Sequence, residues 1–170
     1  RFPGVWAHGD RATLTERGTV VITGRSDGTL NRGGVRIGTA ELYAVVESFS
    51  EVADSLVVHV EDPAGGPGEI WLFVVEAGDN PAEPPDANGP LPDRLRKALR
   101  ESLSPRHVPD RVVTIPAIPR TLSGKKLEVP VKRILAGADP GQVLTLASIA
   151  NPESLEAIIA LARERSGDNR

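Results

Sequence analysis

Short runs of apolar and β-branched residues recur along the chain, and turn-forming residues bound each run. Residues 12–15 and 19–23 flank the turn at residues 16–18, a pattern typical of a β-hairpin. Two later runs, residues 55–60 and 70–75, are separated by a segment rich in Gly and Pro. We therefore expect a hairpin near the start of the chain and an antiparallel strand pair in its middle.

Apolar residues spaced by three and four positions predict the helices. Thr39 is the expected N-cap of the first helix, and Asn151, followed by Pro152, is the expected N-cap of the last. Between them, the spacing predicts helices over residues 91–103 and 129–135. The apolar positions are Leu42, Val45, Val46 and Phe49 in the first helix, Leu91, Leu95, Ala98, Leu99 and Leu103 in the second, and Leu155, Ile158, Ile159 and Ala162 in the last.

The order of these elements predicts the fold class. A short strand over residues 35–37 precedes the first helix, and another over residues 111–115 follows the second. The central order is strand, helix, strand, strand, helix, strand, which is the split βαβ pattern of a small sheet with helices packed on it. We predict an α+β protein with an N-terminal β-hairpin, a small split βαβ sheet with flanking helices, and a C-terminal helical tail.

Other segments lack this periodicity. Residues 77–92 hold five prolines, and from Glu61 to Asp93 there are eight acidic residues and no basic one, so we expect a solvated insertion. Residues 116–126 are a predicted loop, and residues 137–146 link the last two helices.

Composition narrows the class of protein. The length of 170 residues suits one ordinary domain with an appendage. The net charge of −3 gives no overall positive field for nucleic acid, and no apolar run approaches the roughly 18 residues that a membrane helix needs. Without Cys the chain has no disulfide or thiolate chemistry, which suits the cytoplasm. Because it also has no Met and no leader pattern, we expect a piece of a longer chain.

The few lysines are unevenly placed. Only four of the 20 basic residues are Lys, and two of these, Lys125 and Lys126, are adjacent on a Ser-Gly turn. Residues 120–133 carry five basic side chains and one acidic one, Glu128. A lysine ammonium on a turn is a compact charge that suits phosphate, and the alternative is an ordinary solvated basic loop. Composition alone leaves both interpretations open.

Established phosphate-binding motifs do not match this turn. If Lys125 is aligned with the lysine of a Walker loop, Pro119 stands where Gly is required and Lys126 where Ser or Thr is required. Residues 33–38 have neither the Lys of a Walker loop nor the Gly spacing of a dinucleotide fingerprint. Their leading glycine pair fits either a plain turn or a close approach of a ligand to the backbone.

Several single residues carry weaker signals. Asp10 can hydrogen-bond the hydroxyls of a sugar or simply cap a turn, and Arg25 and Asp27 have the same two interpretations. The three His residues have no ligand spacing, so no metal site is predicted. His59 is expected to face outward from its strand.

Taken in order, these weak signals combine into one pattern. The segments HGD, GRSD, GGVRIGTAE and PRTLSGK, at residues 8–10, 24–27, 33–41 and 119–125, resemble the C-terminal part of adenylate-forming acyl-CoA synthetases. The resemblance covers nearly the whole chain. The stretch SGKKLEV from Ser123, and the tail around Asn151, look closer to the acetoacetate-specific members than to the acetate-specific ones.

The resemblance implies a two-step ligase of lipid metabolism. A carboxylate attacks the α-phosphate of ATP to give an acyl-adenylate and pyrophosphate, and the thiol of CoA then displaces AMP. The C-terminal domain rotates between the two steps. ATP, with Mg, and CoA would be substrates of the full-length enzyme, with none bound by this fragment alone.

The resemblance also assigns units and roles. Residues 1–26 correspond to the closing hairpin of the large N-terminal adenylation domain, residues 27–136 to the mobile lid domain, and residues 137–170 to a linker and C-terminal helix. Lys125 matches the catalytic adenylation lysine. The remaining assignments are Asp10 and Arg25 for nucleotide binding, Asp27 for the hinge, Gly33 and Gly34 for the CoA channel, and Arg36 and Arg100 as weaker phosphate contacts.

Partners follow from the same resemblance. The expected partner is the protein's own N-terminal adenylation domain, with a protein lysine acetyltransferase that modifies Lys125 as a second, and neither nucleic acid nor membrane is expected. The alternative is a free-standing, ferredoxin-like regulatory module, because the split βαβ sheet often binds small effectors. Calorimetry separates the two, since only the regulatory module should bind a metabolite unaided.

Overall fold

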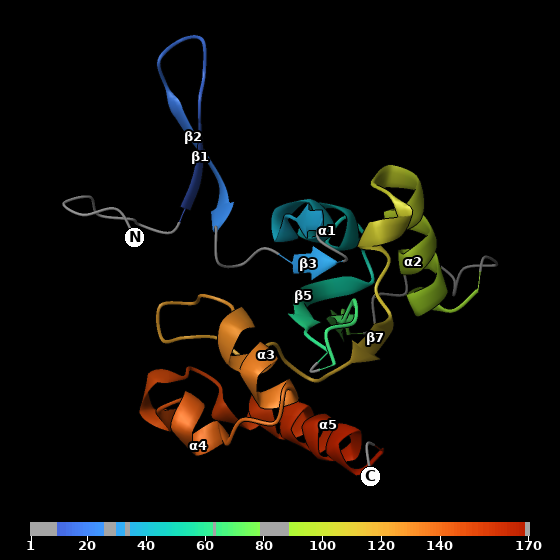
Figure 1. Cartoon of the computed structure of the whole chain (residues 1–170), viewed down its shortest axis with the longest axis vertical. Helices are drawn as coiled ribbons and strands as arrows, with labels where there is room; N and C mark the ends of the chain where they lie inside the picture. The colour runs from blue at the N-terminus through green and yellow to red at the C-terminus, as the bar shows by residue number, and fades with distance from the viewer. Residues whose placement is uncertain (1–9, 26–29, 33–34, 63, 79–88, 169–170) are drawn as a thin grey trace.

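The computed structural model describes residues 10–25, 30–32, 35–62, 64–78 and 89–168 (Figure 1). The described chain has the predicted α+β class and C-terminal helix, and the centre of the predicted insertion lies outside it. None of the described helices is long and apolar enough to cross a membrane.

The described strands are β1 (Asp10–Leu14), β2 (Val20–Arg25), β3 (Leu30–Arg32), β4 (Val35–Ile37), β5 (Val52–Val60), β6 (Glu69–Glu76) and β7 (Arg111–Thr114). The helices are α1 (Thr39–Val46), α2 (Leu91–Ser102), α3 (Glu128–Leu135), α4 (Pro140–Val143) and α5 (Leu155–Asp168). Short 3₁₀ turns are η1 (Pro105–His107), η2 (Leu146–Ser148) and η3 (Pro152–Ser154).

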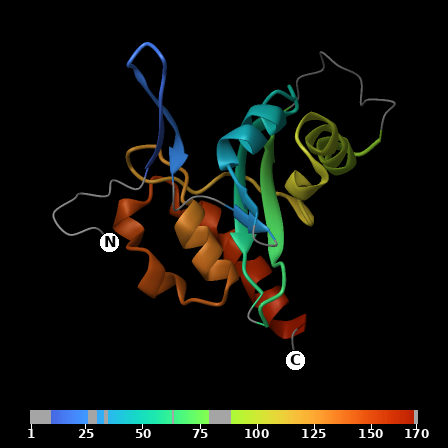
Figure 2. The same cartoon turned by 45° about the horizontal axis from the view of Figure 1, so that its top comes forward.

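A three-stranded sheet with the order β5-β6-β7 forms the centre of the molecule. β5 and β6 pair antiparallel, as predicted, with Leu56 opposite Phe73. β6 pairs parallel with β7, and α2 makes the crossover between them. Because successive side chains of a strand point to opposite faces, the nearly continuous apolar run of β6 covers both faces of the sheet. Helices accordingly pack on each side, as Figure 2 shows.

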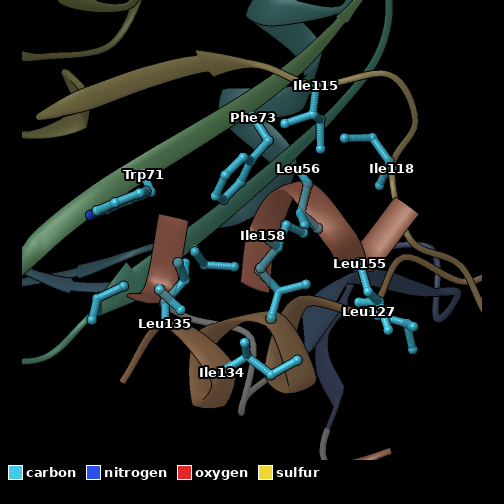
Figure 3. Close-up of a cluster of buried hydrophobic side chains, with 14 of the residues drawn as sticks. Leu56, Trp71, Phe73, Ile115, Ile118, Leu127, Ile134, Leu135, Leu155 and Ile158 are labelled. Carbon is cyan, nitrogen blue, oxygen red and sulfur yellow. The ribbon is translucent and has the colours of Figure 1, made fainter. Parts of the chain in front are cut away.

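Two hydrophobic cores result from this layering. The first lies between the sheet and helices α3 and α5, where Trp71 and Phe73 pack near Ile134 and Ile158 (Figure 3). The second lies between the opposite face and helices α1 and α2. Its buried members are Leu30, Ile37, Leu42, Val46, Val52, Val57, Ile70, Leu72, Val74, Leu95 and Leu99. The C-terminal helix therefore belongs to the same core as the sheet.

The two short sheets are separate from the three-stranded sheet, although Leu30 of β3 and Ile37 of β4 belong to the second core. β1 and β2 form the predicted N-terminal hairpin, which stands away from the central sheet in Figure 1 and turns at Gly18 with a φ of +75°. The strand predicted over residues 35–37 forms as β4, but it pairs with β3 in a sheet of its own. It has no place beside β6, because β5 and β7 already occupy both edges of that strand.

Two predicted helix caps differ from the observed ones. Gly38 is the N-cap of α1 and makes no side-chain hydrogen bond, while Thr39 is the first helical residue. Asn151 precedes η3 rather than α5, and its side chain does not cap that turn. The Asn151 amide instead donates to the Ile118 carbonyl at 2.9 Å and accepts from the Arg120 N–H at 3.0 Å. Its polar groups therefore hold the preceding loop in place.

The prediction for His59 was wrong. Its side chain is only 5% exposed, and its Nε2 lies 2.9 Å from the Pro67 carbonyl oxygen. His59 is the second-last residue of β5, and the Pro67–Gly68 segment before β6 lies against its ring, which explains the difference.

Candidate functional site

The lysine turn is a small hairpin that we call the lysine loop, residues 120–126. Arg120 and Lys126 form an isolated antiparallel bridge, and the Thr121 N–H donates to the Lys125 carbonyl at 2.9 Å. The Gly124 N–H donates to the Thr121 carbonyl at 2.8 Å and closes the turn. Gly124 has a φ of +80°, a conformation that favours glycine, so the turn itself explains this glycine.

The two adjacent lysines have opposite surroundings. Lys125 is exposed, and its ammonium has no hydrogen bond or ion pair with any described residue. The Lys126 ammonium lies 2.6 Å from the Glu47 carboxylate, 3.3 Å from that of Asp54 and 4.0 Å from the centroid of the Tyr43 ring. Lys126 is thus anchored against α1 and β5, whereas Lys125, one residue earlier, is left exposed.

Asp54 gathers the cationic side chains beneath the loop. Its Oδ2 accepts from the Arg120 guanidinium at 2.7 and 3.2 Å, and its Oδ1 accepts from the Ser55 N–H at 2.9 Å. Burial alone raises the pKa of the Asp54 carboxyl, but the hydrogen bonds from Arg120 and the charge of Lys126 outweigh it and lower that pKa. The group is therefore an ionised anchor at neutral pH.

Tyr43 completes the support under Lys126. Its hydroxyl donates to the Glu128 carboxylate at 2.6 Å and accepts from the Val57 N–H at 3.2 Å. Burial raises the pKa of Tyr43 far above its ordinary range, and the nearby Glu128 charge adds to this shift. The phenol thus stays protonated and acts as a fixed donor between α1, α3 and β5.

The basic excess around the loop is largely matched by acids from other elements. Lys126 pairs with Glu47 and Asp54, and Lys132 pairs with Glu61 at 2.7 Å. Of the three lysines between residues 125 and 132, Lys125 alone lacks an ion pair with a described residue. Within the described chain, no three His, Asp or Glu side chains gather as metal ligands.

A comparison with known families decides what this arrangement belongs to. The profile of the AMP-binding enzyme C-terminal domain family matches residues 41–125, half of the 170-residue chain. The chain belongs to this family. The matched AMP-binding C-terminal region begins in α1 and ends at Lys125, so it includes Asp54, Arg120 and the exposed lysine itself.

Individual relatives are similar over nearly the whole chain. Acetoacetyl-CoA synthetase of Gallus gallus is 43% identical over 157 residues, which are 92% of this chain and 22% of the relative. The enzyme of the same name from Rhizobium meliloti is 39% identical over 98% of this chain and 24% of its own length. The chain therefore spans less than a quarter of these curated relatives.

Solved structures give the same picture. Acetoacetyl-CoA synthetase from Streptomyces lividans is 46% identical, with a TM-score of 0.79 over 96% of this chain and 23% of its own. The amide bond synthetase McbA from Marinactinospora thermotolerans is 29% identical, with a TM-score of 0.59 over 74% of this chain and 24% of its own. The AMP-binding C-terminal fold is thus common to synthetases whose names differ.

The other predicted site residues of this AMP-binding C-terminal chain are spread over several elements. Asp10 and Arg25 are directly paired across the open end of the β1–β2 hairpin. Arg36 lies in β4, opposite Asn31, and Arg100 is exposed on α2. Asp27, Gly33 and Gly34 lie outside the described residues. The structure therefore brings Asp10 and Arg25 together and presents Lys125 from a different element.

Sequence reasoning did not single out the residues that support the lysine loop. Arg120 was counted among five basic residues and as part of the PRTLSGK segment but was given no role, and Asp54 and Glu47 were not named. The Arg120–Asp54 pair joins positions 66 residues apart, and no local spacing rule reports such a contact. Asn151 did give a signal, but its polar side chain was interpreted as a helix cap.

Proposed function

We propose that this chain is the C-terminal lid of an ATP-dependent, AMP-forming acyl-CoA ligase, and that it supplies Lys125 to the adenylation step. In this proposal residues 1–26 close the large N-terminal domain, residues 27–136 form the lid that rotates between the two half-reactions, and residues 137–170 form a linker and terminal helix. The observation that carries the proposal is the exposed Lys125 amine, which has no partner among the described residues. The adjacent Lys126, by contrast, is in contact with two carboxylates and an aromatic ring.

The chemistry needs such a group. As the carboxylate attacks, negative charge builds on the oxygens of the α-phosphate, and an ammonium aimed at them stabilises the transition state by a few kcal/mol. The Lys125 ammonium forms no ion pair with a described residue that would have to break before it entered a reaction centre. CoA must use the same opening in the second step, so the amine has to be withdrawn, and a lysine on a rotating lid meets that need.

We propose acetoacetate as the acid and ATP, with Mg, and CoA as the other substrates of the full-length enzyme. Support for acetoacetate comes from the relatives named acetoacetyl-CoA synthetase, which are 39% to 44% identical over nearly all of this chain. The further proposed roles are nucleotide binding by Asp10 and Arg25, a hinge at Asp27, a CoA channel wall at Gly33 and Gly34, and phosphate contacts by Arg36 and Arg100.

Separate assays of the two half-reactions test the role of Lys125. In the longer protein that we propose contains this chain, Lys125→Ala should abolish acyl-adenylate formation, measured by ATP–pyrophosphate exchange. It should spare thioester formation from supplied acyl-adenylate. Lys132→Ala is the matched control, because it removes a nearby lysine whose exposed ion pair with Glu61 contributes little. Equal loss of both half-reactions in Lys125→Ala would contradict the assigned role.

We also propose that Lys125 is the target of a protein lysine acetyltransferase. Acetylation removes the charge that adenylation needs, and Lys125 is exposed on a turn while Lys126 is held in ion pairs. Incubation with an acetyltransferase and acetyl-CoA, followed by peptide mass mapping, should place the acetyl group on Lys125. Modification confined to Lys126 or Lys132 would count against this proposal.

A further inference from the structure

We propose that Arg120 and Asp54 are positioning residues that aim Lys125 during adenylation. This inference rests on the proposed role of Lys125 and adds the device that directs it. Neither residue is assigned a contact with substrate. Their action is on the backbone of the lysine loop.

Arg120 joins the sheet to the residue directly before Lys125. Its Nη2 and Nε donate to Asp54 Oδ2 at 2.7 and 3.2 Å, and its Nη1 donates to the Gly124 carbonyl at 2.6 Å. The planar guanidinium fixes these donors in one fork, and charge-assisted hydrogen bonds are the stronger kind. One side chain therefore connects β5 to the C-terminal half of the turn.

Asp54 provides a rigid base for this connection. It lies in β5 at a register shift between Val52 and Asp54, and such bulges re-aim side chains at the end of a strand. Its carboxylate accepts from Arg120, from the Ser55 N–H and from Lys126, so both oxygens are engaged. A carboxylate held by three groups has little freedom to turn.

The contacts of Arg120 and Lys126 with Asp54, which we call the clamp, restrict the backbone on both sides of Lys125. Gly124 is held through its carbonyl by Arg120, and Lys126 is held through its ammonium by Asp54 and Glu47. The Lys125 N–H also donates to the Thr121 hydroxyl at 3.0 Å. With the backbone restrained on both sides, the Cα–Cβ bond of the exposed Lys125 leaves the loop in a fixed direction.

The loss expected from breaking the clamp is confined to one half-reaction. A misplacement of about 1 Å can cost about a hundredfold in rate when a group must meet a reaction centre. Lys125 acts only in adenylation under the proposed function, so thioester formation should not depend on its aim. A residue needed only for folding would instead lower both half-reactions together.

The experiment compares Asp54→Asn, Arg120→Gln and the double variant in the longer protein. Each single variant should lower kcat for adenylation by about tenfold to a hundredfold, while the KM for ATP and the rate of thioester formation stay near those of the unaltered protein. Because the two residues act as a unit, the double variant should lose little more than the worse single one. Glu61→Gln is the control, since it breaks the ion pair between Glu61 and Lys132, which also lies in the proposed lid, without changing a contact of the lysine loop.

Three outcomes overturn the inference: unchanged adenylation in Asp54→Asn, equal loss in both half-reactions, or fully additive losses in the double variant. If thermal unfolding shows that Asp54→Asn does not fold, Arg120→Lys replaces it. That variant keeps the charge but lacks the fork that reaches both Asp54 and Gly124, so its adenylation alone should fall.

Lys125→Ala is assayed in parallel. Adenylation that survives in Lys125→Ala refutes the proposed function. Loss of adenylation in Lys125→Ala together with normal adenylation in Asp54→Asn refutes only the positioning role of Arg120 and Asp54.

Discussion

Lys125 and Lys126 are consecutive residues of the same type whose roles are set by where the acids lie. Asp54 and Glu47 form ion pairs with Lys126, whereas the ammonium of Lys125 forms none with a described residue. Lys126 thus becomes a structural group over the Tyr43 ring, while Lys125 stays in solvent. The contrast depends on tertiary contacts rather than on any difference between the two lysines.

At this scale, the buried phenol of Tyr43 makes a prediction about alkaline pH. Because the pKa of Tyr43 is raised in the folded chain, its neutral form stabilises the fold fully below the ordinary tyrosine pKa near 10. The free energy of unfolding should therefore fall as the pH rises above about 10, where the unfolded chain releases the proton and the folded chain keeps it. Tyr43 is the only tyrosine of the chain, so tyrosinate absorbance reports this one group.

Tyr43→Phe is the matching variant. It removes the acceptor of the Val57 N–H and a donor to Glu128, and should lower the free energy of unfolding by about 1 to 3 kcal/mol at neutral pH. Other groups still titrate, but the tyrosine part of the alkaline loss should disappear. Urea unfolding of both proteins at neutral and alkaline pH checks this, and a tyrosinate signal rising near pH 10 while the chain remains folded would contradict it.

At the scale of elements, the C-terminal helix α5 is part of the packed structure. Leu155 and Ile158 are buried in the core formed by the sheet and α3, and the Arg165 guanidinium donates to the Leu135 carbonyl at 2.8 Å. Residues 137–170 therefore both link α3 to α5 and contribute side chains to the core. Removing the α5 side chains would expose part of the sheet face that bears Trp71 and Phe73.

Truncating one side chain of α5 should consequently weaken the whole fold. Ile158→Ala is expected to lower the free energy of unfolding by about 2 to 5 kcal/mol, because it leaves a cavity at a fully buried position. Glu164→Ala, at an exposed position of the same helix, is the control and should change it by less than about 0.5 kcal/mol. Denaturant titration measures both, and equal small effects would mean that α5 is not packed as described.

The sequence predicted most elements because their signals are local. The β-branched runs of β5 and β6, and the helical spacing of Leu95 and Leu99, report burial within a few residues of chain. The pairing of β4 with β3 and the burial of His59 could not be predicted, because both depend on which segments cover the sheet. The turn that carries Lys125 was predicted because its Ser-Gly signal is local. Its support by Asp54 was not, because that contact joins residues far apart in the sequence.

At the scale of the molecule, this chain is a small sheet between two helical layers, with the lysine loop at its edge and a hairpin standing apart (Figure 1). It matches less than a quarter of the length of its curated relatives. The proposed reaction also needs an acyl pocket and a grip on the pyrophosphate of ATP. We assign both to a large domain outside these residues.

The isolated chain should therefore fold without acting as an enzyme. Incubated with ATP, Mg, CoA and acetoacetate, it should form no acyl-CoA, and calorimetry should detect little or no nucleotide binding. Measurable acyl-CoA formation by these 170 residues would refute the division of labour proposed here. Tight binding of a metabolite by the isolated chain would favour the regulatory module instead.

Protection of lysines from chemical labelling shows directly whether the Lys125 amine enters the nucleotide site. The longer protein is treated with an amine-reactive reagent, alone and with Mg, acetoacetate and an ATP analogue whose α–β bond cannot be cleaved, and the labelled lysines are quantified by peptide mass. Lys125 should react readily in the free protein and be protected in the complex, while the labelling of Lys132 changes little. Equal labelling of Lys125 in both states would show that its amine does not enter the nucleotide site, and would refute the proposed role of Lys125.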